Sequence, residues 1–289
     1  MESQISVVAE GHGFPECPRW HNGEIWFTLS RQIMITSLDG QMRVFGELEG
    51  PLVLGLAFLE DGSILSGSAL QRRIYRLFPD GHRDLFADLS DEVADITNEC
   101  VLGPDGSVYV GSVGFNLLKG ESPKPTRLVR IAPDGSISRV GPEMTMPNGM
   151  VWSKDGRTLY VAESIGAKIT ALSVKDDGDL VLDRVVADLS GSDAHHPDGL
   201  AVDTDGSLFY ADPELPGGVI VHIDGSGREI ERYMVGLPYA TSCALGGDDG
   251  RTLFVTASEA MASPGEDQTQ RAAIVSVPLT RSTASTGRR

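Results

Sequence analysis

Residues 150–164 read MVWSKDGRTLYVAES, two apolar runs on either side of a turn that ends in Asp-Gly. Asp-Gly between alternating apolar runs is a strong β-hairpin signal, because glycine adopts the positive φ of a tight turn. Five further copies of the pattern are CPRWHNGEIWFT (17–28), LAFLEDGSILSGS (56–68), VLGPDGSVYVGS (101–112), LAVDTDGSLFYAD (200–212) and CALGGDDGRTLFVTAS (243–258). The chain therefore contains six equivalent hairpins.

A second series of hairpins lies between the first. Its members are MITSLDGQMRVF (34–45), IYRLFPDGHRDLF (74–86), LVRIAPDGSISRV (128–140), ITALSVKDDGDLVLDRV (169–185) and VIVHIDGSGREIERYM (219–234). Two hairpins give four strands per repeat of about 40–50 residues, which is the size of a propeller blade. The sequence predicts an all-β fold, a six-bladed β-propeller with four antiparallel strands per blade.

The two ends of the chain complete this prediction. The sixth hairpin is followed by a single apolar run, RAAIVSVPL (271–279), so its blade lacks one strand, whereas QISVVAEG (4–11) belongs to no blade. We expect residues 1–13 to supply the missing strand and close the ring, which protects the edge strands. Residues 1–289 are expected to form one domain, with 281–289 as a disordered tail and 88–99 as a loop.

Composition excludes several classes of partner. Forty-one acidic against 24 basic residues give a net charge of −17, which would repel nucleic acid. No signal peptide and no membrane-spanning apolar run is recognisable. Three widely spaced cysteines, without a CxxC pair, argue against a disulfide framework or a thiolate zinc site and favour a cytoplasmic protein. A small-molecule substrate is the expected partner, and the oligomeric state stays open.

Aligning the six hairpins on their turn glycines reveals one polar position. It lies eight residues before the glycine, or seven in the first hairpin, whose turn is one residue shorter, and it holds Glu16, Leu54, Asn98, Asn148, Asp198 and Ser242. The innermost strands of a propeller line its channel, so we expect these side chains to meet near the axis as a ring. Two positions further on, every strand carries an apolar residue or cysteine.

Two carboxylates and two amides in a narrow channel favour a cation between them, since close carboxylates otherwise repel. All-oxygen ligands suit a hard ion, with Ca²⁺ expected first and Mg²⁺, Mn²⁺ or Zn²⁺ as alternatives. We interpret Glu16, Asn148 and Asp198 as ligands of one divalent metal ion, Asn98 as a ligand or substrate contact, and Ser242 as a small residue that fills the ring. A single Asp or Asn before glycine is usually a turn residue, but the shared position favours the metal site.

Two other groups of residues invite interpretation. His195 and His196 stand just before Asp198, where one could shuttle protons near neutral pH, although an exposed loop histidine is the simpler interpretation. Cys17, Cys100 and Cys243 have no His or Asp partner in the same phase, so we interpret them as buried structural thiols.

The stretches FPECPRW (14–20), TNECVLGPDGSVYVG (97–111), MPNGMVWSKDGRTLYVAES (146–164), HPDGLAVDTDGSLFYAD (196–212) and TSCALGGDDGRTLFVTAS (241–258) resemble one family. It comprises the senescence-marker-protein, gluconolactonase and luciferin-regenerating-enzyme-like proteins, which include regucalcin. The resemblance implies a six-bladed propeller and metal-dependent lactone hydrolysis. It also implies that Glu16, Asn148 and Asp198 are the metal ligands, that Asp198 is the general base, and that Asn98 contacts the substrate or a metal-bound water.

The chain departs from the sugar-lactone hydrolases of that family at the mouth of the channel. Ile96 stands where those enzymes carry a basic residue that binds substrate hydroxyls, and the loop GFNLLKGE (114–121), with Phe115, is apolar. An apolar wall offers hydroxyls no hydrogen-bond partners. We therefore expect a lactone less polar than an aldonolactone, with Asn98, Ile96, Phe115 and His196 as substrate contacts.

Two rival functions remain open from sequence. A lyase, isomerase or hydratase could use the same metal to stabilise an enolate, because fold and metal do not determine the reaction. A non-catalytic calcium- or ligand-binding protein would instead saturate the metal with protein ligands.

Overall fold

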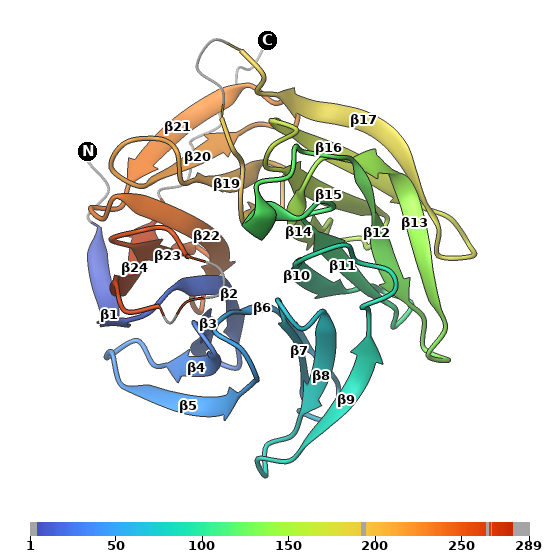
Figure 1. Cartoon of the computed structure of the whole chain (residues 1–289). Coiled ribbons are helices and arrows are strands. Elements are labelled where there is room, and N and C mark those ends of the chain that lie inside the picture. Colours follow the sequence, from blue (N-terminus) through green and yellow to red (C-terminus); the bar gives the residue numbers. More distant parts are fainter. Residues whose placement is uncertain (1–4, 192–194, 264–265, 267, 280–289) are drawn as a thin grey trace.

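The computed structural model describes residues 5–191, 195–263, 266 and 268–279, and these residues form six four-stranded antiparallel sheets arranged as a ring (Figure 1). The predicted six-bladed propeller is thus confirmed. In blades one and two the strands, from the axis outward, are β2 (Pro15–His21), β3 (Glu24–Leu29), β4 (Gln32–Thr36), β5 (Met42–Glu47), then β6 (Val53–Phe58), β7 (Ile64–Ser68), β8 (Arg73–Leu77) and β9 (Arg83–Asp88).

The remaining blades follow the same order. Blades three and four consist of β10 (Thr97–Leu102), β11 (Val108–Ser112), β12 (Thr126–Ile131), β13 (Ile137–Met144), then β14 (Pro147–Trp152), β15 (Thr158–Glu163), β16 (Lys168–Val174) and β17 (Leu180–Asp188). Blades five and six consist of β18 (Leu200–Val202), β19 (Leu208–Asp212), β20 (Val219–Ile223), β21 (Glu229–Met234), then β22 (Tyr239–Gly246), β23 (Thr252–Ser258), β24 (Arg271–Pro278) and β1 (Ser6–His12).

The N-terminal strand closes the ring as predicted. β1 pairs antiparallel with β24, from Ser6 opposite Ser276 to His12 opposite Arg271, and so becomes the outermost strand of the sixth blade. Of the expected loop over 88–99, residues 89–96 form a loop, whereas residue 88 ends β9 and residues 97–99 begin β10. The predicted tail at 281–289 lies outside the described residues.

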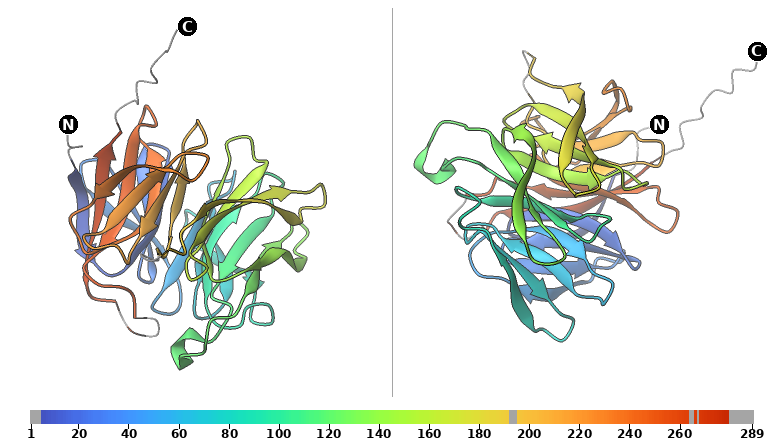
Figure 2. Two further views of the ribbon diagram at one scale, coloured as in Figure 1. Left: turned by 90° about the horizontal axis from the view of Figure 1, so that it is seen from above. Right: turned by 90° about the vertical axis from the view of Figure 1, so that its right-hand side faces the viewer.

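One short helix interrupts the described part of the chain. This helix, η1 (Leu117–Lys119), is a single 3₁₀ turn in the loop after β11. The loop projects beyond one face of the ring (Figure 2, green). No helix within the described ranges is long and apolar enough to cross a membrane.

The innermost strands do not alternate regularly. Their pairing with the second strand shifts register between Glu16 and Arg19 in the first blade, and comparable shifts begin at Leu54, Thr97, Pro147 and Ala240. A β-bulge of this kind bends a strand and re-aims its side chains. Cys100, which simple alternation places at the axis, packs instead between blades two and three in an apolar cluster.

Candidate functional site

The predicted ring lies at the starting end of the innermost strands. Glu16, Asn98 and Asn148 are the second residues of β2, β10 and β14, and Asp198 lies in the chain that leads into β18. Glu16, Asn98 and Asp198 are each less than one-tenth exposed. The bulges that begin at this level explain how the strands turn their second residue toward the axis.

Glycines bring the neighbouring strands close enough for the ring to form. A Cβ on Gly149 would overlap the main-chain oxygen of Asp198, and a Cβ on Gly199 would overlap the side chain of Ser242. Blades four, five and six therefore touch through main chain at this level. The ring needs glycine after Asn148 and after Asp198 because no side chain fits there.

Hydrogen bonds join the fourth and fifth blades at the ring. Asn148 Nδ2 donates to Ser164 Oγ at 3.1 Å, and that hydroxyl donates to the main-chain oxygen of Pro197 at 2.8 Å. The Asn148 side chain acts on the Asp198 carboxylate toward a lower pKa, against the larger opposite effect of burial. The main chain beside Asn148 lies against the main chain of Asp198, although about fifty positions separate the two residues along the chain.

Burial dominates the electrostatics of the two ring carboxylates. The pKa of Glu16 lies well above its usual value because burial disfavours the charged form, and the charges of Asp198 and Glu99 raise it further. Burial likewise raises the pKa of Asp198 well above its usual value, and the charges of Glu99 and Asp212 add to the effect. Both carboxylates would be stabilised in the ionised form by a cation between them.

The ring residues fit a hard cation by their donor atoms. Two buried carboxylates and two carboxamides supply oxygen ligands, and the Ser242 hydroxyl is buried without a hydrogen-bond partner among the described residues. Within those residues, no group of three or more His, Cys, Asp or Glu side chains is placed to hold a metal. A cation here would depend on the amide oxygens as well as the carboxylates.

The predicted substrate contacts Ile96 and Phe115 lie together beside the ring. Both are almost completely buried and pack in one apolar cluster with Phe14, Leu52 and Leu54. The loop that carries Phe115 leaves β11 at the ring end, since Thr97 is opposite Ser112. Their contact with a substrate stays a prediction, because the structure shows only that their side chains pack against other apolar side chains.

The two histidines before Asp198 differ in their surroundings. His195 Nδ1 lies 2.5 Å from Asp212 Oδ2, and the Asp212 side chain is fully buried at the end of β19. The main-chain N–H of His196 donates to Asp212 Oδ1 at 3.4 Å, whereas its Nδ1 atom is buried without a partner within the described ranges. His195 is therefore an anchored residue rather than an exposed one.

Sequence reasoning missed three charged residues near the ring. Glu99 follows Asn98, is 3% exposed and forms an ion pair with Arg19 at 2.5 Å. Asp212 holds the loop of His195. All three lie in the quoted motifs, but their importance depends on contacts between blades that a single sequence does not reveal.

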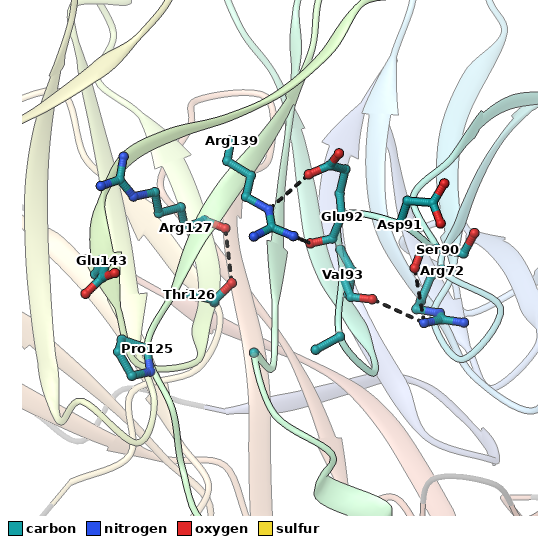
Figure 3. A pocket seen from close by; sticks show the side chains of 12 residues that line it. Arg72, Ser90, Asp91, Glu92, Val93, Pro125, Thr126, Arg127, Arg139 and Glu143 are labelled. Carbon is teal, nitrogen blue, oxygen red and sulfur yellow. Dashed lines mark hydrogen bonds and ion pairs between the residues drawn. The ribbon is translucent and has the colours of Figure 1, made fainter.

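Two further cavities lie away from the ring residues. An axial cavity of about 430 Å³ lies at the end of the channel away from the ring, and residues of all six innermost strands line it. They include four residues of the predicted apolar layer, Leu56, Met150, Leu200 and Ala244. A groove of about 550 Å³ lies between blades two and three. Figure 3 shows two arginines that line it: Arg139 donates a hydrogen bond to the Glu92 carboxylate, and Arg72 donates one to the main-chain oxygen of Val93. None of the ring residues lines either cavity.

Comparison with known proteins places the chain in one family. The model of the SMP-30/Gluconolactonase/LRE-like region matches residues 14–259. The pentonolactonase XacC of Haloferax volcanii is 29% identical over 230 residues, which cover 78% of this chain and 75% of the relative. The regucalcin of Danio rerio is 26% identical over 178 residues, which cover 60% of this chain and 57% of the relative.

Solved structures agree on the fold. A luciferin-regenerating enzyme superposes with a TM-score of 0.79 at 17% identity, covering 96% of this chain and 95% of the other. The calcium-binding protein regucalcin of Agrobacterium tumefaciens superposes with a TM-score of 0.76 at 22% identity, covering 96% of each chain. At these sequence identities the structural similarity shows the fold alone. With the family match over residues 14–259, the chain belongs to the SMP-30/gluconolactonase/LRE-like family.

Proposed function

We propose that this protein is a metal-dependent hydrolase that opens a lactone or a related cyclic ester. The observation that carries the proposal is the pair of buried carboxylates, Glu16 and Asp198, beside the Asn148 amide at the end of the channel. Membership of a family that includes gluconolactonases, and similarity to a pentonolactonase, support the same reaction class.

In this proposal Glu16, Asn148 and Asp198 hold one divalent ion, Ca²⁺ by preference given their oxygen donors. When bound, such an ion supplies Lewis-acid polarisation of the lactone carbonyl. Asn98, the fourth polar residue of the ring, donates its amide hydrogens to a substrate oxygen and so orients the lactone.

Asp198 serves as the general base. Its carboxylate accepts a proton while the water oxygen adds to the carbonyl carbon. The C–O bond of the lactone ring then breaks, and the proton passes to the leaving alkoxide, so that the product is a hydroxy acid. Without an ion, burial and the charges of Glu99 and Asp212 favour the protonated form of Asp198. A bound cation would keep this carboxylate ionised and so able to accept a proton.

The apolar cluster beside the ring supports a substrate with few hydroxyls. Ile96, Phe115 and Leu54 offer it no hydrogen-bond donor or acceptor from their side chains. A polyhydroxylated lactone would leave hydroxyls unpaired on this side, which costs affinity. We propose an aliphatic or aromatic lactone, with Asn98 and His196 as the polar contacts.

The proposal is tested by offering the purified protein a panel of sugar, aliphatic and aromatic lactones, with Ca²⁺ and with chelator. We expect ring opening to a hydroxy acid, lost on chelation and faster for the less polar lactones. Turnover that continues in chelator would contradict the metal dependence. A product that has not incorporated a water molecule would favour a lyase or isomerase instead. Ion binding without turnover of any lactone would favour a binding protein.

A further inference from the structure

Two charged residues break the pattern of the innermost strands. The residue after each ring position is small in five blades, Cys17, Gly55, Gly149, Gly199 and Cys243, but it is Glu99 in the third. The residue three places after the ring position is apolar in five blades, Ala57, Val101, Val151, Ala201 and Leu245, but it is Arg19 in the first. Each exception places a charge among apolar strands, which is costly unless the charge is paired.

The two exceptions meet. Arg19 Nη2 donates to Glu99 Oε1 at 2.5 Å, and Arg19 Nη1 donates to the main-chain oxygen of Pro18 at 2.9 Å. The second carboxylate oxygen of Glu99 accepts the main-chain N–H of Met150 at 2.9 Å. Both oxygens of Glu99 are therefore occupied by the protein, so Glu99 is a poor candidate for a metal ligand even though it follows a ring residue.

The pair lies between the ring and the cavity at the other end of the channel. The charge of Glu99 acts on both Glu16 and Asp198, whereas the side chain of Arg19 lines the far cavity. Glu99 is buried, and Arg19 keeps about one-fifth of its side chain exposed, 21%. The ion pair thus lies directly beneath the ring.

The charges around the axis then balance a divalent ion. Glu16, Asp198 and Glu99 bring three negative charges, and Arg19 compensates one of them. Without the guanidinium, the buried Glu99 charge would act unopposed on any cation in the ring, and the attraction would be greater for a trivalent ion than for a divalent one.

We propose that the Arg19–Glu99 pair sets the charge of the ring for a divalent cation. Arg19 is then the residue that determines this specificity, and Glu99 is a positioning residue that links β10 to β14. The inference rests on the proposed metal site. It assigns these residues no contact with substrate, and the link from Glu99 to Met150 fixes the strands that carry Asn98 and Asn148.

The test compares the dissociation constants of Ca²⁺ and Tb³⁺, measured by calorimetry on the full chain. Arg19→Met should tighten Tb³⁺ relative to Ca²⁺ by about tenfold. Glu99→Gln should shift the ratio the opposite way, and Arg19→Met with Glu99→Gln should return it close to the original value. A purely structural role would weaken both ions together and leave the ratio unchanged.

The outcomes separate this inference from the proposed function. A wild-type protein that binds neither ion overturns the metal site and the inference with it. A wild-type protein that binds Ca²⁺, with an unchanged ratio in Arg19→Met, overturns the inference alone. If Arg19→Met does not fold, an unchanged ratio in Glu99→Gln overturns the inference in the same way.

Discussion

Asp198 combines several features that an active carboxylate needs. It is buried, its main chain lies against Gly149, and its main-chain N–H donates to the main-chain oxygen of Ala211 at 2.8 Å. Burial and the charges of Glu99 and Asp212 raise the pKa of Asp198, and neither of these two residues belongs to the ring. Position and proton affinity therefore both depend on the surrounding blades.

The first prediction concerns Asp198 directly. Asp198→Ala should lower kcat/KM by about 10²–10⁴-fold, because the proton acceptor is lost. Asp205→Ala is the matched control, since Asp205 belongs to the same blade but caps its hairpin turn through Ser207. Steady-state hydrolysis of the best lactone measures both. Full activity in Asp198→Ala would refute its role as base.

The second prediction concerns pH and the ion-free protein. The pKa of Glu16 is raised in the folded state, so its contribution to stability is present below its ordinary value of 4.5 and is lost as pH rises through the folded value. In chelator the melting temperature should therefore fall as pH rises above the ordinary pKa of 4.5, and Ca²⁺ should reverse this loss. Glu16→Gln should flatten the dependence. A melting temperature that changes with neither pH nor Ca²⁺ would argue against a charged, cation-binding ring.

At the scale of the strands, the sequence predicts the hairpins and the ring but not the bulges. Counting back from the turn glycines, with one residue allowed for the shorter first turn, is enough to align Glu16, Asn98, Asn148 and Asp198, because each blade repeats the same hairpin. The register shifts within the innermost strands leave no signal in the alternation of apolar residues. For that reason simple alternation wrongly assigns Cys100 to the axial layer, and it does not reveal the Arg19–Glu99 pair.

The third prediction tests the close approach of the inner strands. Gly149→Ala should destabilise the fold by about 1–3 kcal/mol, because its Cβ would overlap the main chain at Asp198. It should also weaken cation binding by moving Asn148 and Asp198 apart. Gly191→Ala, where a Cβ meets no atom of the described residues within 4 Å, is the control. Chemical denaturation and Ca²⁺ titration provide the measurements, and equal behaviour of the two variants would contradict the packing account.

At the scale of the whole molecule, ring closure depends on a strand from the other end of the chain. β1 covers the edge of β24, and Ala9 packs in an apolar cluster with Ile25, Phe27 and Ile274. The isolated sixth hairpin and RAAIVSVPL make this closure predictable, because an unpaired edge strand is unfavourable. The closed ring is what holds blades one and five, and hence Glu16 and Asp198, at fixed positions.

The fourth prediction tests this closure. A chain that starts at Gly13 lacks β1, so it should melt at a lower temperature and associate through the exposed edge of β24. A chain that starts at Ile5 retains β1 and should behave as the full chain. Thermal melting and size-exclusion chromatography distinguish them. Identical melting of the two truncated chains would show that closure by β1 contributes little.

We propose that the ring brings Glu16, Asn148 and Asp198 around a single cation. Calorimetric titration of the metal-free protein with Ca²⁺, alongside the double variant Glu16→Gln, Asp198→Asn, tests this proposal. We expect one bound ion per chain in the wild-type protein and no measurable binding in the variant. Undiminished binding in a folded double variant, or none in the wild-type protein, would contradict it.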